Sequence, residues 1–440
     1  MRIRFFLVLS LILVCGSILA GCVSGPGSEN KPVSPAATIT AVPQLTETNA
    51  PPTATEEENA VIAANNQFAF DLYKKLKDDP DNSQKNIVFS PLSISSVMAI
   101  VGEGARGKTA DEIQTVFHFP DDTTTLHQGY SGLIGTIGAG NDNDTTLQLA
   151  NALWAENTYP FLPEYTETAM RYYDAKTTGL DIENDPDGSL NTINRWVEDK
   201  TKGRITNLLS REDIDPESTR LLITNSLYFS GTWVKKFGSP SMGPFRISPN
   251  ETVSVPMMFR SIWADFNYAE FPDMQVVELL YTTSTGHQNS MLVILPKDDN
   301  LQEVENSLDT DKLNQIRQSL EYQELAYIMF PKFSTESRYT LPEILKSMGM
   351  PRAFSRVADF SGMDGMQENL YIDDVIHKTF IDVNEDGTQA AASTVGSMKS
   401  QGGSHGNPPF VADHPFIFII QDRDNGAILF MGRVMNPAAG

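Results

Sequence analysis

The residue whose spacing best suits covalent chemistry is Ser404, which lies in the stretch Gly402-Gly403-Ser404-His405-Gly406. This stretch matches the G-x-S-x-G pattern of hydrolases, in which a sharp turn between a buried strand and a helix exposes the nucleophile. Here Pro408-Pro409 follows at once and small polar residues precede the stretch, so no helix can begin where the pattern needs one. We therefore expect no hydrolase site at Ser404.

Two other patterns could bind a metal ion, and neither is complete. Residues 382–387, "DVNEDG", match the first half of an EF-hand calcium loop, which needs a bidentate carboxylate at its twelfth position. That position is Ser393, and the flanking residues predict strands instead of helices. The six histidines show no H-E-x-x-H spacing or other metal-ligand cluster. The sequence predicts no metal, no other cofactor and no catalytic residue.

Residues 385–394, "EDGTQAAAST", form a run of small side chains in which charge stops at Asp386 and returns only at Lys399. In a strand, one face of this run would carry Thr388, Ala390, Ala392 and Thr394, and the other would carry Gln389, Ala391 and Ser393. Such a segment suits entry into a packed sheet, because interiors have no spare volume and a buried charge costs several kcal/mol. Gly387 is expected to act as the hinge, since its backbone turns freely through unusual angles. A flexible Ala/Ser loop is the alternative, but it does not explain the missing charge.

The elements that must position this run belong to one large domain, predicted over residues 59–440. An amphipathic helix opens it, because apolar residues recur at helical spacing at Val61, Ala64, Phe68, Leu72 and Leu76. Residues 146–155 alternate as a strand does, and residues 415–434 predict two strands joined through Asp424-Asn425-Gly426. Helical patterns dominate the first half and apolar strand-like runs the second, which indicates an α+β fold.

The N-terminus predicts export. Residues 1–21 combine a short basic region with an apolar core, which is typical of a signal peptide. Leu19-Ala20-Gly21-Cys22 resembles the lipobox of bacterial and archaeal lipoproteins, in which the signal is cut before a cysteine that carries lipid. Residues 22–58 are rich in Pro, Thr and Ser and predict a disordered tether. We expect a cell-surface protein anchored to the membrane through Cys22; a plain signal peptide and a secreted protein are the alternative.

The composition narrows the choice of partners. The chain has 440 residues and a formal net charge of -23, which argues against nucleic acid because phosphate binding needs a basic surface. It has two cysteines, and Cys15 would leave with the signal, so we expect no disulfide in the mature protein.

Six stretches resemble the serpin family in sequence and in order, from about Asn59 to Pro437. They are "NIVFSPLSIS" (86–95), "ITNSLYFSGTW" (223–233), "FPKF" (330–333), "DVIHKTFIDVNEDGT" (374–388), the hinge-like "NEDGTQAAAST" (384–394) and the signature-like "FVADHPFIFII" (410–420). The resemblance implies the serpin fold: an α+β domain with three β-sheets, eight to nine helices and an exposed reactive-centre loop. It also implies a monomeric serine protease inhibitor, not an enzyme. Such an inhibitor is cleaved as a suicide substrate, traps the acyl-enzyme as a covalent 1:1 complex and inserts its loop as a strand.

The same resemblance implies roles for individual residues. Four of them would form the family's shutter, beneath the point where the central sheet opens: Ser90, Ser93, Asn225 and His377. Trp233, Lys332 and Glu385 would form the breach, where the loop enters, with an ion pair between Lys332 and Glu385. The hinge would comprise Glu385, Gly387, Thr388, Ala390, Ala391, Ala392, Ser393 and Thr394.

The cleaved bond is predicted less sharply. Counting from Glu385 by the family's spacing gives Gln401–Gly402, which we rank first. Lys399 ranks second, because it would suit a trypsin-like protease, and Ser404, favoured by counting back from Pro415, ranks third. A non-inhibitory serpin and an inhibitor of cysteine proteases remain alternative functions, and the sequence does not identify a target.

Overall fold

The computed structural model describes residues 54–297, 300–388 and 407–439. Contacts divide the chain into two units, 1–48 and 49–440, and every described residue belongs to the second. Gln389–Gly406, Cys22 and the rest of residues 1–53 therefore lie outside the described residues.

Ten α-helices lie within the described residues. The first, α1 (Glu56–Asp78), begins with a capping box in which Thr55 and Glu58 bond each other's backbone, and it buries the apolar residues that predicted it. The others are α2 (Pro91–Gly104), α3 (Gly107–Phe117), α4 (Thr123–Ala139), α5 (Pro163–Tyr173), α6 (Pro186–Lys200), α7 (Leu301–Ser307), α8 (Thr310–Ser319), α9 (Pro342–Met348) and α10 (Ser361–Asp364). Three single 3-10 turns span Pro80–Asn82, Arg211–Asp213 and Arg352–Phe354.

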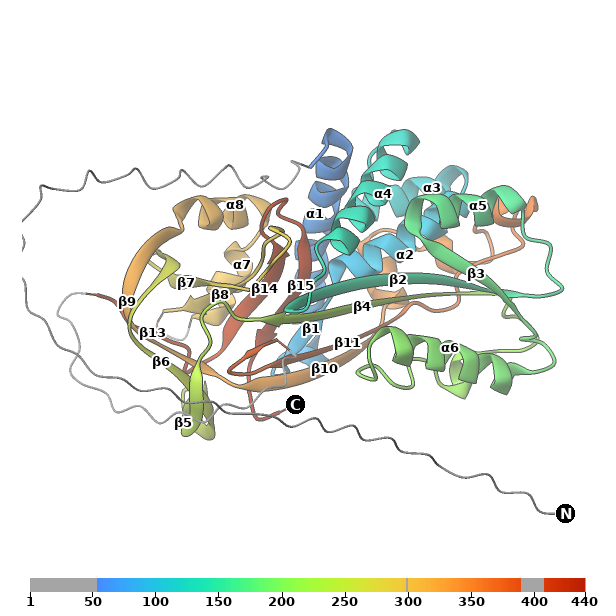
Figure 1. Ribbon diagram of the computed structural model, residues 1–440. Helices are drawn as coiled ribbons and strands as arrows, with labels where there is room; N and C mark the ends of the chain where they lie inside the picture. The colour runs from blue at the N-terminus through green and yellow to red at the C-terminus, as the bar shows by residue number, and fades with distance from the viewer. Residues whose placement is uncertain (1–53, 298–299, 389–406, 440) are drawn as a thin grey trace, which may run out of the picture. The chain divides into compact units, whose positions relative to one another are not determined.

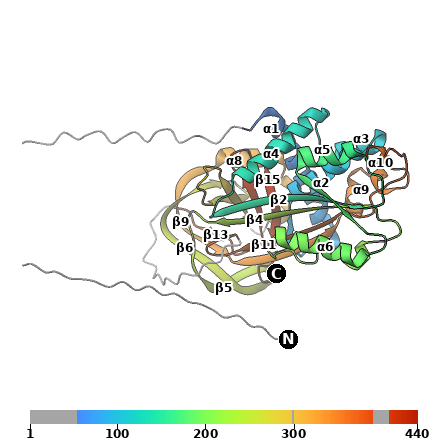
Figure 2. The ribbon, with the colours of Figure 1, turned by 45° about the vertical axis from the view of Figure 1, so that its right-hand side comes forward.

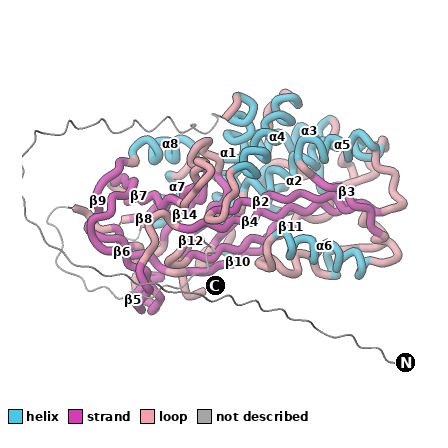
Figure 3. The backbone as a smooth tube through the Cα atoms, in the orientation of Figure 1, coloured by secondary structure: helices cyan, strands magenta, loops and turns pink. Residues whose placement is uncertain are grey.

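A six-stranded sheet runs through the middle of the domain (Figure 1). Its strands, in spatial order, are β10 (Phe333–Thr340), β11 (Ile376–Val383), β12 (Gly387–Thr388), β4 (Leu221–Thr232), β2 (Thr145–Glu156) and β3 (Ala175–Leu180). The two-residue strand β12 stands between β11 and β4, as the tube in Figure 3 also shows. It runs antiparallel to both, so β4 and β11 are parallel to each other.

The remaining strands form one nine-stranded sheet, where two further sheets were expected. Its path is β1 (Ile87–Phe89), β15 (Ile428–Val434), β14 (Phe416–Asp422), β8 (Asn289–Pro296), β7 (Met274–Leu280), β6 (Glu251–Glu270), β9 (Glu321–Pro331) and β13 (Phe410–Val411), with β5 (Gly238–Ser248) paired to β6. The long strand β6 joins the strands into one sheet, because it pairs with β5 near its start and with β7 near its end. Its pairing with β9 runs along most of its length, with a register shift between Ser261 and Ala264. The predicted turn Asp424-Asn425-Gly426 joins β14 to β15, with Gly426 at a positive φ of 80°.

Helices cover both faces of the six-stranded sheet. Leu153 of β2 points into the main core beneath α2, whereas its neighbour Trp154 packs with Ile193 and Val197 of α6 in a separate cluster. Adjacent strand residues point to opposite faces, so α6 lies on the other side of the sheet from α2, as Figure 2 shows. A strand entering this sheet would therefore have the main core on one face and α6 on the other.

Candidate functional site

The central feature of the six-stranded sheet is a gap between β4 and β11. Among the described residues, no ladder pair joins these strands directly, and β12 alone bridges them at one end. At the other end lies a cavity of about 430 Å3, whose walls include Val97 of α2, Leu222 and Asn225 of β4, and Ile376 and His377 of β11. Within the described residues, the two parallel strands are thus bridged at one end only.

The bridged end is made by Gly387 and Thr388, the first residues of the small-residue run. Gly387 is opposite Thr232, and Thr388 is opposite both Gly231 of β4 and Val383 of β11. Thr388 is 1% exposed, and its hydroxyl lies 2.7 Å from the hydroxyl of Tyr281. The hinge has therefore already entered the sheet by two residues.

Gly387 is needed here for a different reason from the one predicted. The sequence led us to expect unusual backbone angles, but Gly387 is not among the residues with positive φ and belongs to an extended strand. A Cβ at this position would lie 1.9 Å from the carbonyl oxygen of Gly231. The constraint is close backbone approach, and any side chain would push β12 away from β4.

An aromatic stack supports the inserted residues. Trp233 is 2% exposed and lies against Tyr281, with ring centroids 4.4 Å apart. Its indole N–H donates to the carbonyl oxygen of Asn384 at 3.0 Å, and its backbone N–H donates to that of Asp386 at 2.8 Å. Because burial raises the pKa of Tyr281, its phenol stays protonated and available to Thr388. Trp233 thus holds the chain just before the hinge, and Tyr281 holds the hinge itself.

Two lysines bind the acids that precede Gly387. Lys332 lies 3.3 Å from Glu385, so the ion pair expected at the breach is present. Lys236 lies 3.0 Å from Asp386, a contact that the sequence did not reveal. Both lysines are 40% or more exposed, so each pair adds about 1 kcal/mol or less and serves mainly to position the chain.

His377 and Ser90 connect α2 to β11 under the gap. The backbone N–H of Ser90 donates to Nε2 of His377 at 3.0 Å, and the hydroxyl of Thr379 lies 2.6 Å from the same nitrogen. An amide N–H can only donate, so Nε2 must be the unprotonated nitrogen of a neutral ring. Burial lowers the pKa of His377 to about 3, which agrees with this tautomer.

Ser93 and Asn225 connect the same helix to β4. The Ser93 hydroxyl donates to Oδ1 of Asn225, whose amide donates to the Ser96 hydroxyl at 3.2 Å and to Asn151 of β2 at 2.7 Å. The four residues assigned to the shutter therefore lie together: Ser90 caps α2, Ser93 is in its first turn, and one partner is on each side of the gap. The N-terminal turn of α2 is hydrogen-bonded to both strands that would have to part.

The remaining predicted residues lie outside the described part of the chain. These are Ala390, Ala391, Ala392, Ser393 and Thr394 of the hinge, the candidate cleavage residues Lys399, Gln401, Gly402 and Ser404, and Cys22.

Sequence reasoning missed Asn384 and Tyr281. Oδ1 of Asn384 accepts the backbone N–H groups of Asp386 and Gly387 at 3.0 and 3.3 Å, which turns the chain from β11 into β12. An Asn whose side chain accepts the backbone N–H two residues later forms an Asx turn, and an Asn just after a strand is a recognisable signal for such a turn. Tyr281 has no such local signal, because its partners come from distant parts of the chain.

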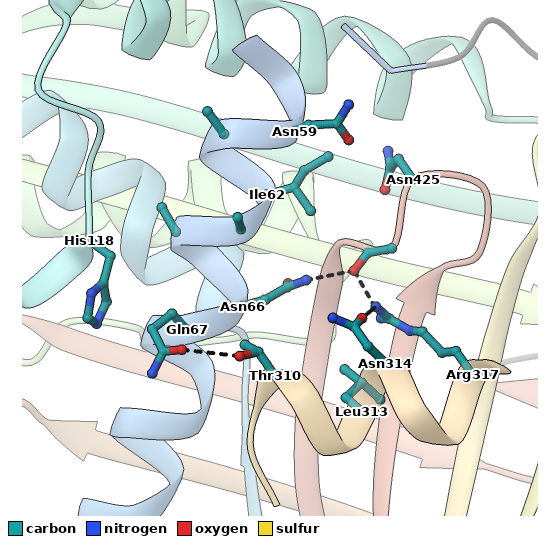
Figure 4. Close-up of a pocket in the computed structure, with 14 residues that line it drawn as sticks. Asn59, Ile62, Asn66, Gln67, His118, Thr310, Leu313, Asn314, Arg317 and Asn425 are labelled. Carbon is teal, nitrogen blue, oxygen red and sulfur yellow. Dashed lines mark hydrogen bonds between the residues drawn. The ribbon is translucent and has the colours of Figure 1, made fainter. Parts of the chain in front are cut away.

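A second cavity, of about 530 Å3, lies between α1, α8 and the turn from β14 to β15 (Figure 4). Asn66 and Arg317 both donate to the carbonyl oxygen of Gly426, at 2.8 and 3.0 Å, and the Thr310 hydroxyl lies 3.3 Å from Oε1 of Gln67. None of its lining residues belongs to β4, β11 or β12, so this cavity is not part of the gap.

Comparisons with known proteins agree with this geometry. The family model "Serpin (serine protease inhibitor)" matches residues 63–437. An uncharacterised serpin-like protein of Thermococcus kodakarensis is 40% identical, with 87% of each chain covered, and the leukocyte elastase inhibitor of Bos taurus is 38% identical over 85% of this chain and 99% of its own. The crystal structure of Serpin48 from the insect Tenebrio molitor is similar with a TM-score of 0.73 and 29% identity, over 87% of this chain and 99% of that one. The expected serpin fold is confirmed, and the chain belongs to the serpin family, whose members are non-enzymatic inhibitors or binding proteins.

Proposed function

We propose that this protein inhibits serine proteases as a suicide substrate, by inserting its cleaved loop into the gap between β4 and β11. The protease serine attacks the carbonyl carbon of one loop peptide bond. The amine of the next residue leaves, and an ester joins the loop to the enzyme. The loop then continues the strand that β12 begins and carries the protease with it. The observation that carries the proposal is the match between the length of this gap and the length of the uncharged run.

The register of β12 makes this match explicit. Thr388 is opposite Gly231, and an antiparallel strand moves back one residue on β4 for each residue it adds. Leu221, the first residue of β4, would therefore be opposite Met398. The next residue is Lys399, where charge returns. The uncharged run is thus long enough to fill the gap, and all three candidate cleavage residues lie beyond its end.

The side-chain alternation supports the same reading. Thr388 points toward Tyr281 and the main core, so Ala390, Ala392 and Thr394 would follow it on that face. Gln389, Ala391 and Ser393 would face α6. Both faces would receive small or uncharged side chains, which a packed interior accepts without the cost of burying a charge.

Insertion supplies the free energy that inhibition requires. Ten further residues would gain hydrogen bonds to the two flanking strands at roughly 1 kcal/mol each, and the chain would advance about 33 Å along β4. The ester would be pulled with it, and distortion of the protease active site would remove the oxyanion geometry that deacylation needs. Insertion must precede deacylation, which at typical turnover takes about a millisecond to a second.

The decisive experiment is incubation with a panel of serine and cysteine proteases, followed by denaturing electrophoresis and mass spectrometry. An inhibitor should give a complex that survives denaturation and contains protease plus the chain up to the cleaved residue. The released C-terminal peptide identifies the bond: a peptide beginning at Gly402 would support Gln401. A protease whose catalytic serine is replaced by Ala is the control, because it cannot form the ester. Clean loop cleavage by every protease without any complex would identify a non-inhibitory member of the family. A complex with cysteine proteases alone would show that the targets are cysteine proteases instead of serine proteases.

We also propose that the protein is exported and held on the cell surface by lipid on Cys22, for which the lipobox-like Leu19-Ala20-Gly21-Cys22 is the support. Within the part of the chain that the structure describes, no helix is both long and apolar enough to cross a membrane.

A further inference from the structure

Three buried polar atoms without a hydrogen bond of acceptable geometry belong to residues at one end of the strands β8 and β14. They are Nε2 of His287, Oδ1 of Asn289 and Oδ2 of Asp422, on residues that are 9%, 2% and 0% exposed. His287 lies in the loop from β7 to β8, Asn289 begins β8, and Asp422 ends β14. Burying a polar atom without a hydrogen-bond partner is destabilising, so three such atoms in neighbouring residues require an explanation.

Two of these atoms are in contact, and the third belongs to the residue opposite Asp422. Nε2 of His287 is 2.9 Å from Oδ2 of Asp422, a contact that a protonated ring or a shared cation would each make favourable. Asn289 and Asp422 are directly opposite each other on neighbouring antiparallel strands, so their side chains lie on the same face. Ligand atoms that share an ion at about 2.0–2.2 Å lie roughly 3 Å apart, which is the separation of the His287 and Asp422 atoms.

The groups around these atoms fit a metal ligand set. Oδ1 of Asp422 accepts the backbone N–H of Asp424 at 3.0 Å, which fixes the carboxylate and leaves Oδ2 free. Oδ2 of Asp424 lies 3.4 Å from Nδ1 of His287 and accepts the backbone N–H of Gln288 at 2.7 Å. A carboxylate on the second ring nitrogen is the usual means of orienting a metal-binding histidine.

We propose that His287, Asp422 and Asn289 bind a divalent transition-metal ion of the zinc class, with Asp424 positioning the imidazole. One imidazole nitrogen with a carboxylate and an amide oxygen is a mixed N/O set, which suits Zn2+, Co2+ or Mn2+ better than the all-oxygen sites of Ca2+ and Mg2+. A protonated His287 would donate Nε2–H to Asp422 and Nδ1–H to Asp424, but it would leave Oδ1 of Asn289 without a partner. An ion would instead engage the buried atoms of His287, Asp422 and Asn289 together.

The surroundings favour a cation and allow the ring to fit. Asp142 binds the β7–β8 loop by accepting the backbone N–H and hydroxyl of Ser284, so a third carboxylate supports the same loop. Gly140 packs against the ring, and a Cβ there would lie 2.6 Å from Cδ2 of His287. No local pattern predicts this site, because His287 and Asp422 come from two hairpins that are distant in sequence.

An ion here would link the β7–β8 loop to the β14–β15 turn, whose Asn425 appears in Figure 4. Tyr281 lies at the start of that loop, and its backbone N–H donates to the carbonyl oxygen of Asn289 at 3.1 Å. Asn289 of the proposed site therefore contacts Tyr281, the residue that binds Thr388 of the hinge. The proposed site does not depend on the inhibitory function.

The test uses the untagged, full-length protein after treatment with a chelator. Titration with Co2+ should give one equivalent of binding by calorimetry, with a visible absorption band. Zn2+ should raise the unfolding temperature by about 3 °C when free ion is roughly 100 times its Kd. Asp422→Asn and His287→Gln should abolish both effects, and Asp424→Asn should weaken binding roughly 10- to 100-fold.

The matched control is His118→Gln, since His118 pairs with Asp71 at 2.8 Å at an exposed position away from this cluster. It should bind Co2+ as the wild type does. The proposal fails if the wild type binds neither ion up to about 1 mM, or if Asp422→Asn and His287→Gln retain binding. It also fails if stability responds to pH alone, which would identify a simple imidazolium–carboxylate pair. Should the two core variants not fold, the partly exposed Asp424→Asn still decides the question.

Discussion

Thr388→Arg is the sharpest test of the insertion mechanism, because Thr388 is both the last described residue of the hinge and already buried. An arginine there has two ways to respond. It can stay in the sheet, where an unpaired buried charge costs several kcal/mol. Alternatively, β12 can leave the gap and lose its contacts with Thr232, Gly231 and Val383 as well as the hydrogen bond to Tyr281. That loss is about four hydrogen bonds at roughly 1 kcal/mol each.

The chain will take the less costly route, so the penalty is about 3–4 kcal/mol. Each 1.4 kcal/mol on the insertion barrier slows insertion tenfold, which predicts a slowing of about two to three decades. Deacylation should then overtake insertion. The variant should be cleaved as a substrate and release active protease, with its fold intact.

The assay is the stoichiometry of inhibition against one protease that the wild type inhibits. Ala391→Arg is the control, because it adds the same charge to the opposite alternation and outside β12. We expect the stoichiometry to rise much more for Thr388→Arg than for Ala391→Arg. Equal stoichiometries close to the wild-type value for both variants would refute insertion of this segment. A second control, Thr388→Val, keeps the shape and removes only the bond to Tyr281, so its effect should be about one decade or less.

Three further predictions concern stability and location. Cleavage of the loop should raise the unfolding temperature sharply, because the inserted strand adds ladder bonds and buried surface; an unchanged temperature after clean cleavage would count against insertion. His377 has a lowered pKa, so its neutral ring stabilises the fold fully above about pH 6.5 and this stability is lost as pH falls toward its folded pKa of about 3. Between pH 7 and pH 5, the free energy of unfolding measured with denaturant should fall by about 2 kcal/mol less for His377→Gln than for the wild type. An equal fall in both proteins would show that His377 is not the group responsible. Cys22→Ser should release the protein from the membrane fraction into the medium, and a variant that stayed with the membrane would exclude a lipid anchor on Cys22.

Local patterns predicted the elements well. The spacing of Phe68 and Leu72 predicted α1, and Asp424-Asn425-Gly426 predicted the turn between β14 and β15, because each depends on residues close in sequence. The absence of charge after Asp386 predicted a segment suited to burial, and its first two residues, Gly387 and Thr388, are in the sheet.

Contacts between distant residues could not be predicted in the same way. Tyr281 supports Thr388 across the fold, and no pattern around either residue indicates the other. Gly387 was predicted for its backbone freedom, whereas the constraint that the structure shows there is the carbonyl oxygen of Gly231, a residue on another strand. His287 and Asp422 meet only because β8 and β14 are neighbours, so a search for metal-ligand spacing in sequence had nothing to find.

The proposed insertion would break the contacts across the gap in a defined order. At the hinge end the first strand pairs are already formed, because Thr388 has a partner on each flanking strand. The α2 end is closed by hydrogen bonds from one helical turn to both sides, through Ser90 to His377 and through Ser93 to Asn225. In the proposed insertion, a strand that grows from Thr388 would meet these bonds last, and the polar side chains could exchange them for bonds to the arriving backbone without leaving a buried group unpaired. The barrier to insertion should consequently lie late, at the α2 end, whereas Thr388→Arg acts early, at the start of the strand. Substitutions at the two ends should then slow insertion independently, and their effects on its free-energy barrier should add.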